Sequence, residues 1–107
     1  MASPFIYNQV YRLEEYNEVI DVILVFDAYK INGTLAVSLY TADDGELYDV
    51  ITVNLPESSS LPEDVQFVDV NNHPTIPEWL IGNGLAEPYP ATARSGYCEY
   101  PAFRFLK

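Results

Sequence analysis

The sequence predicts an α+β fold: an antiparallel sheet of about five strands, with a meander at its centre and one short helix packed on one face. Short stretches rich in β-branched and aromatic residues predict the strands. Turn sequences containing glycine separate the central stretches, as expected of hairpins. One segment in the second half carries both a start signal and a stop signal for a helix.

Three consecutive strands form the predicted meander, and the first two are joined by a hairpin. Val19–Tyr29 is the most apolar stretch, and its length and β-branched composition favour a central strand over a helix. Asn32-Gly33 follows and predicts a tight hairpin, because both positions of such a turn need a positive φ. Thr34–Thr41 then alternates large apolar with smaller or polar residues.

A second turn leads into the third strand of the meander. Ala42–Gly45 combines Asp side chains that can bond the backbone with a glycine suited to a left-handed position. Glu46–Leu55 is the returning strand, in which alternation places Tyr48 and Val50 on one face. Because Tyr40 and Tyr48 flank the turn, we expect them to lie near one another across the hairpin.

Four further segments flank the meander. Phe5–Leu13 is expected to be a strand or an irregular arm, and the polar run Glu14–Glu18 to be a turn. Pro56–Pro62 is expected to be a loop, because it is rich in serine and its prolines cannot donate to a strand ladder. Val65–Val70 is the expected fourth strand.

The helix is expected directly after the turn sequence that contains the one histidine. Thr75 or Ile76 lies just outside its start, Pro77 lies in its first turn, and Gly82 or Gly84 ends it. The residues expected to face the core are Trp79, Leu80 and Leu85.

Two segments complete the chain. Ala86–Arg94 contains two prolines and is expected to be a loop. Gly96–Leu106 alternates aromatic residues and is expected to be the last strand, with Pro101 marking a sheet edge or a bulge.

Length and composition exclude several classes of protein. A chain of 107 residues is the size of a single domain, here residues 1–107, and its 49% hydrophobic content is too high for a disordered chain. A net charge of −11 argues against direct binding to nucleic acid or to an anionic membrane. The sequence lacks an apolar run long enough to span a bilayer, and its start does not resemble a signal peptide. We therefore expect a cytoplasmic protein, as a monomer or a small homo-oligomer.

The sequence offers little for catalysis, for a metal site or for a cofactor site. His73 lies in a turn sequence and is expected at the surface, and Cys98 in the last strand is expected to be buried and inert. No serine lies in a GxSxG elbow, and Asp43-Asp44-Gly45 lacks the spacing of a calcium loop. We therefore expect no catalytic residue, no metal and no cofactor, although carboxylate pairs leave a small metal-dependent enzyme as a remote alternative.

The acidic residues are concentrated in one part of the chain. Between Glu14 and Asp69 there are 13 Asp and Glu residues and one cation, Lys30, so this stretch carries a net charge of −12. One interpretation is solubility, because like charges keep small proteins apart. The other is that the carboxylates imitate a phosphate backbone and occupy a basic nucleic-acid groove.

The second interpretation yields a set of candidate partner-binding residues. They are carboxylates around the second turn and in the first polar run, with tyrosines beside the turn that can stack on arginine. The set is Asp43, Asp44, Glu46, Asp49, Glu14, Glu15, Glu18, Tyr40 and Tyr48.

Four blocks of the second half carry a family resemblance. They are Val53–Pro56, Phe67–Asn72, Asn83–Pro88 and Ser95–Pro101. In that order they resemble small uncharacterised proteins carried by conjugative elements and prophages of Firmicutes, over roughly residues 33–105. The resemblance implies an accessory role in mobile DNA and transfers no catalytic residue, because the family has no assigned reaction.

Small acidic proteins in that setting often disarm host defence, as anti-CRISPR and anti-restriction proteins do. We therefore expect a non-enzymatic inhibitor whose partner is a protein with a basic nucleic-acid groove, such as a CRISPR nuclease. The alternative is an adaptor or regulatory protein of the mobile element that binds a protein partner through a tyrosine-rich sheet face. Salt separates the two, because it weakens contacts between exposed charges more than apolar contacts.

Overall fold

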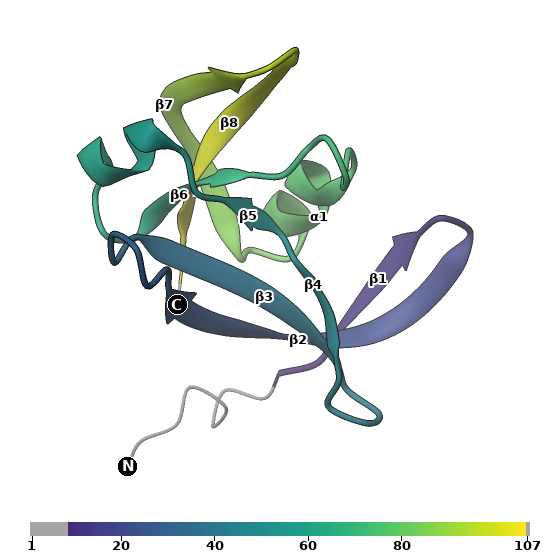
Figure 1. The fold of residues 1–107 in the computed structure, drawn as a ribbon. Helices are drawn as coiled ribbons and strands as arrows, with labels where there is room; N and C mark the ends of the chain where they lie inside the picture. The colour runs from purple at the N-terminus through teal and green to yellow at the C-terminus, as the bar shows by residue number, and fades with distance from the viewer. Residues whose placement is uncertain (1–8, 107) are drawn as a thin grey trace.

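The computed structural model describes residues 9–106, which form eight strands, one α-helix and one short 3₁₀ helix (Figure 1). The first sheet is antiparallel and has the order β1-β2-β3-β4. Its strands are β1 (Tyr11–Glu15), β2 (Glu18–Ala28), β3 (Leu35–Thr41) and β4 (Leu47–Val50). The predicted meander is therefore confirmed in β2, β3 and β4, with the apolar β2 in the interior of the sheet. The part of the first predicted segment at residues 5–8 lies outside the described residues.

A second antiparallel sheet has the order β5-β6-β8-β7. Its strands are β5 (Thr52–Val53), β6 (Val65–Val68), β7 (Ala86–Ser95) and β8 (Cys98–Phe105). The α+β class and the short helix are confirmed, but the single sheet of about five strands is wrong, because the strands divide into two sheets of four.

The division occurs at Ile51, within what the sequence presents as one returning strand. The Ile51 N–H donates to the Val37 carbonyl of the first sheet at 3.0 Å, and the Asp69 N–H donates to the Ile51 carbonyl at 2.8 Å. The chain thus leaves the edge of β3 and joins the edge of β6 without a turn. A continuous alternating pattern carries no mark of such a change of partner.

The hairpin turns differ in type from those expected. Glu15 faces Glu18 across a two-residue turn in which Tyr16 and Asn17 both have positive φ, 54° and 64°. That is the backbone of a tight type I′ turn, built here without glycine. Asn32-Gly33 belongs instead to a longer loop, and there only the glycine has positive φ. The predicted hairpin between β2 and β3 is thus confirmed, and its tight turn type is wrong.

The expected loop at Ala86–Arg94 is wrong, because these residues lie in β7. β7 is an edge strand, so its prolines need not donate to a neighbouring strand on their outer side. The register with β8 shifts between Tyr89 and Thr92, opposite Ala102 and Pro101. The bulge that Pro101 suggested is therefore present, although its extra residues belong to the neighbouring strand.

Helix α1 (Ile76–Gly82) begins after Thr75 and carries Pro77 in its first turn, as expected. Gly84 follows its end with a positive φ of 68°, and the Leu85 N–H donates to the Leu80 carbonyl at 2.9 Å. Left-handed glycine beyond the last helical turn satisfies carbonyls that the helix leaves unpaired. The expected loop after β5 contains a short 3₁₀ helix, η2 (Pro56–Ser60).

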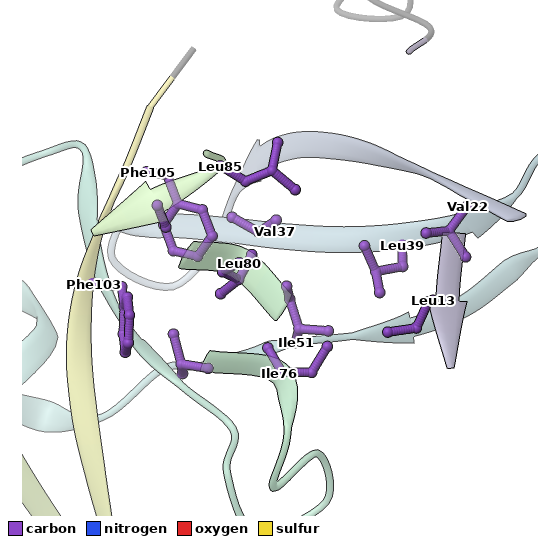
Figure 2. Packing of buried hydrophobic residues seen from close by; sticks show 12 residues of the cluster. Leu13, Val22, Val37, Leu39, Ile51, Ile76, Leu80, Leu85, Phe103 and Phe105 are labelled. Carbon is purple, nitrogen blue, oxygen red and sulfur yellow. The ribbon is translucent and has the colours of Figure 1, made fainter. Parts of the chain in front are cut away.

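The main hydrophobic core lies between the two sheets and α1 (Figure 2). In Figure 2, Leu80 of α1 lies between Phe103 of the second sheet on one side and Leu39 of the first sheet on the other. The residues of α1 that are fully buried are Ile76 and Leu80, and Leu85 is buried beyond its end. A smaller cluster around Phe67 packs elsewhere on the second sheet. No helix among residues 9–106 is long and apolar enough to cross a membrane.

Candidate functional site

A polar cluster of four side chains, which we name the His73 cluster, links β1, β4 and the loop before α1. Its members are Glu15, Tyr48, Asp49 and His73. Three of the four belong to the predicted binding set, but the histidine that joins them does not. The local structure explains how each side chain reaches this place.

A bulge in the β3–β4 pair brings Tyr48 and Asp49 to the same place. Asp49 faces Leu39 and Leu47 faces Tyr40, so Tyr48 is the extra residue between the two pairs. The additional residue interrupts the alternation of side chains, and both Tyr48 and Asp49 reach the His73 cluster. The expectation that Tyr48 lies beside Tyr40 across the hairpin is therefore wrong.

His73 is 3% exposed, so the expectation of a surface histidine is wrong. The turn that holds it is closed by Asp69, whose carboxylate accepts from the Asn72 N–H at 3.2 Å and from the Asn72 side chain at 2.8 Å. The His73 N–H donates to the Asp69 carbonyl at 3.0 Å, and the Ile76 N–H donates to the His73 carbonyl at 3.1 Å. The predicted turn is confirmed, but the His73 side chain is buried because it packs against the first sheet.

Both ring nitrogens of His73 face carboxylates. Nδ1 lies 2.9 Å from Oε2 and 3.0 Å from Oε1 of Glu15, and Nε2 lies 2.8 Å from Oδ2 of Asp49. An ionised carboxylate only accepts hydrogen bonds, so each ring nitrogen must carry a proton. Between two ionised carboxylates, this geometry fits a positively charged imidazolium.

Glu15 is buried, which corrects its place in the expected acidic surface. It follows the buried Leu13 at a spacing of two residues, so both side chains point to the inner face of β1. The Tyr48 hydroxyl donates to Glu15 Oε1 at 2.8 Å, in addition to the bonds from His73. A buried carboxylate needs such partners, because burial of an unpaired charge is costly.

The surroundings change the pKa of two members of the cluster. Burial alone lowers the pKa of His73, but hydrogen bonds and charges from Glu15 and Asp49 outweigh it and raise that pKa above 6.5. Burial raises the pKa of Tyr48, and the hydrogen bond to Glu15 with the charges of Glu15 and Glu18 raises it further. The tyrosine therefore stays a neutral donor, and the raised pKa of His73 favours its charged form.

Tyr16 adds a second tie between the first hairpin and the same loop. Its hydroxyl donates to the Asn72 carbonyl, next to His73 in the chain. Its φ of 54° is unusual for a bulky residue, and such strain persists only where surrounding contacts hold it. The β1–β2 hairpin is thus fixed to the loop at its tip as well as through Glu15.

The His73 cluster is built for holding and not for nucleophilic chemistry. Neither ring nitrogen of His73 is free to take a proton from a nucleophile, because both face carboxylates. Cys98 lies at the start of β8 and is half-buried, less covered than expected. Over residues 9–106, no group of three or more His, Cys, Asp and Glu side chains is arranged to hold a metal ion.

The other predicted carboxylates lie at the tips of two hairpins. Asp43, Asp44 and Glu46 are exposed in the β3–β4 turn, and Glu14 and Glu18 are exposed at the end of the β1–β2 hairpin. Asp44 accepts from the Thr41 hydroxyl and from the Glu46 N–H, and these bonds lower the pKa of Asp44. The turn therefore holds at least one fixed negative charge.

Asp21 joins the turn from the neighbouring strand, and the sequence did not indicate it. The Ala42 N–H donates to the Asp21 carbonyl at 2.8 Å, and the Asp21 side chain is exposed. We name the exposed carboxylates of the two hairpins and of Asp21 the acidic surface. Its members are Glu14, Glu18, Asp21, Asp43, Asp44 and Glu46.

Tyr40 lies on the outer face of the first sheet, away from the His73 cluster. It pairs with Ile23 and lines an open hollow with Val25 and Val10. Ile23 and Val25 alternate with core-facing residues of β2, which explains why this face is partly apolar. Tyr40 and Tyr48, which are predicted to act together, therefore have different places: Tyr40 lines the outer hollow, and Tyr48 belongs to the His73 cluster.

The sequence held one signal that could have pointed to the His73 cluster. A strand that includes the apolar Leu13 places Glu15 on the same face, and a buried carboxylate calls for a cationic or donor partner. His73 is the one histidine in the chain, but it lies 58 residues from Glu15. Nothing local connects the two positions.

The comparisons with known proteins give a family and no more. A family model described as a domain of unknown function, DUF4313, matches residues 23–107, a range that begins within β2, includes β3 to β8 and leaves out Glu15. No curated protein and no solved structure matches the chain. The range agrees with the resemblance seen in the second half of the sequence and extends it to β2. The chain therefore belongs to the DUF4313 family.

Proposed function

We propose that the protein is a non-enzymatic inhibitor that places its acidic surface in the basic nucleic-acid groove of a host defence effector, such as a CRISPR nuclease. The observation that carries the proposal is that none of these carboxylates forms an ion pair within residues 9–106, although Arg12 stands opposite Asp21 in the β1–β2 register. Within residues 9–106, the ion pairs are those of His73 with Glu15 and Asp49, and that of Arg104 with Asp64. The acidic surface itself is not neutralised by any of them.

The unpaired carboxylates of the acidic surface repel one another, and they also attract a basic partner. Like charges on one fold repel one another, so a solvated surface that needed only solubility would gain from interspersed cations. A basic groove supplies the missing cations from outside, and charge complementarity accelerates the encounter. The mobile-element setting that the resemblance suggests supports the same proposal, because defence effectors that cut nucleic acid have such grooves.

Charge reversal in the β3–β4 turn tests the proposal. The variant Asp43→Lys/Asp44→Lys changes two exposed turn residues and should retain the fold. The matched control is Glu57→Lys/Glu63→Lys, which makes the same change in net charge at exposed positions outside the acidic surface.

The assay has two stages. Tagged protein first captures the effector from a bacterial lysate and is eluted by a salt step, and mass spectrometry identifies the captured protein. Cleavage of target DNA by that effector is then measured with each variant. We expect the turn variant to lose inhibition at least tenfold and the control to retain it, with inhibition weakening as salt rises. Equal inhibition by both folded variants would show that the β3–β4 turn does not contribute to inhibition.

The outer face of the first sheet favours a second candidate, an adaptor that binds a protein partner through apolar contact. Tyr40, Ile23 and Val25 line a hollow there, and Leu47 beside it is 54% exposed. A partner held by this face would remain bound through high salt, in contrast to one held by carboxylates. The substitution Tyr40→Ser should release such a partner and leave the salt-sensitive inhibition unchanged.

A further inference from the structure

His73 joins the two edges of the first sheet. β1 and β4 are the outer strands of the order β1-β2-β3-β4, and they do not pair with one another. Glu15 extends from β1 and Asp49 from β4, and both bond the same imidazole. One side chain from a distant loop therefore connects two strands that have no backbone ladder between them.

The connection through His73 depends on a proton, whereas the Tyr48–Glu15 bond between the same two strands does not. The neutral imidazole has one N–H donor, so it can donate to Glu15 or to Asp49 but not to both. With both carboxylates ionised, loss of the proton leaves a ring nitrogen lone pair facing a carboxylate oxygen at 2.8–3.0 Å. Two acceptors at that distance repel, and the buried Glu15 then loses the cation that balances it.

The other charged and titratable groups near the ring come from each neighbouring element. Tyr48 of β4 donates to Glu15, and the charge of Glu18 of β2 acts on Tyr48. Tyr16 and Asp69 hold the loop residue Asn72. None of these groups supplies a second cation, so the proton on His73 is what balances the cluster.

We propose that His73 is a proton-operated clamp: its charged form links β1 to β4, and its deprotonation breaks this link and loosens the β1–β2 hairpin from β4, leaving the Tyr48–Glu15 bond between them. Because these strands lead to the two hairpin tips, the clamp also sets the arrangement of the acidic surface. That second consequence rests on the proposed function. The clamp itself does not depend on any partner.

Whether the clamp weakens at high or at low pH follows from the direction in which folding changes the pKa of His73. The pKa of His73 is raised in the folded protein above the ordinary value of 6.5, so the folded state holds the proton where the open state has lost it. The clamp is therefore complete below about pH 6.5. It weakens as pH rises from 6.5 through the raised pKa of His73.

Native protein tests the clamp by NMR without any partner. The ring nitrogen and carbon shifts of His73 report its protonation, and amide exchange, corrected for the intrinsic rate at each pH, reports local opening. We expect the opening equilibrium of residues 11–15 and 47–50 to rise about tenfold per pH unit above 6.5 until His73 has titrated. Residues 98–105 of the second sheet serve as the internal reference. A neutral ring at pH 6, or opening that is the same from pH 6 to 9, would overturn the clamp.

Variants with matched charge change provide the second measurement. Asp49→Asn removes a carboxylate whose side chain is 49% exposed, so the fold should survive. It should move the titration of His73 to lower pH, so that the rise in opening still begins near pH 6.5 but ends at a lower pH and is smaller. Asp64→Asn, the control, removes the carboxylate that pairs with Arg104 and should change neither. An unchanged His73 titration in Asp49→Asn would contradict the proposal. These outcomes are independent of whether inhibition is found, so the clamp and the proposed function can fail separately.

Discussion

A buried amide between the two sheets allows a prediction of stability in numbers. Gln66 of β6 is fully buried, and its Oε1 accepts from the Ser58 hydroxyl at 2.7 Å and from the Phe67 N–H at 2.9 Å. Its Nε2 donates to the Leu35 carbonyl at 2.9 Å and to the Thr34 hydroxyl at 3.2 Å. One side chain thus connects η2 and the second sheet to the start of β3.

The substitution Gln66→Leu keeps the volume and removes all four hydrogen bonds. At about 1 kcal/mol net per bond, the loss is roughly 4 kcal/mol, and the more apolar side chain offsets about 1 kcal/mol of it. We therefore expect the free energy of unfolding to fall by roughly 3 kcal/mol. That is a large share of the 5–15 kcal/mol typical of a domain.

Urea unfolding followed by tryptophan fluorescence measures the effect. With a slope of about 1.5 kcal/mol per molar urea, the midpoint should fall by roughly 2 M. Two neighbouring serines provide graded controls. Ser58→Ala removes two bonds, the one donated to Gln66 and the one accepted from the Leu55 N–H, and should cost about 2 kcal/mol. The exposed Ser59→Ala should stay within about 0.5 kcal/mol. A loss below 1 kcal/mol for Gln66→Leu at an unchanged slope would refute the assignment of Gln66 as a link between the sheets.

Two further predictions concern the helix and the acidic turn. Leu80→Ala should lower the free energy of unfolding by about 2–5 kcal/mol, because Leu80 is fully buried. The neighbouring substitution Ile81→Ala should cost far less, because Ile81 is 50% exposed. Equal losses of the two variants in urea unfolding would contradict the packing of α1 on the core. Thr41→Val removes the hydroxyl bond that is the largest cause of the lowered pKa of Asp44, so this pKa should rise toward 3.8. In the native protein the stability from ionised Asp44 is present above 3.8 and is lost as pH falls through the lowered pKa, and the variant should show less of this loss. Carboxyl NMR titration checks the second prediction, and an unchanged Asp44 titration would contradict it.

The features that the sequence predicted are those set by neighbours in the chain. The apolar β2, the glycine turn at Gly45 and the helix that starts after Thr75 depend on local residue types, and all are present. The edge strand β7 was missed because its prolines resemble a loop when the strand order is unknown. The change of sheet at Ile51 was missed because alternation is the same whichever strand is the partner.

The candidate site was predictable only in part, for the same reason. The exposed carboxylates of the β3–β4 turn follow from turn chemistry, which places Asp43 and Asp44 in solvent. The position of Tyr48 depends on a one-residue bulge, and the burial of His73 depends on contacts with β1 and β4. Such long-range contacts leave no periodic trace in the sequence.

Ile51 has a consequence for the way in which this protein gains and loses its structure. Because its N–H serves one sheet and its carbonyl serves the other, neither sheet has a complete edge without it. A disturbance that frees this residue therefore removes a hydrogen bond from both halves at once. We expect the two sheets to melt as one cooperative unit, with exchange of the Ile51 and Asp69 amides as slow as global unfolding.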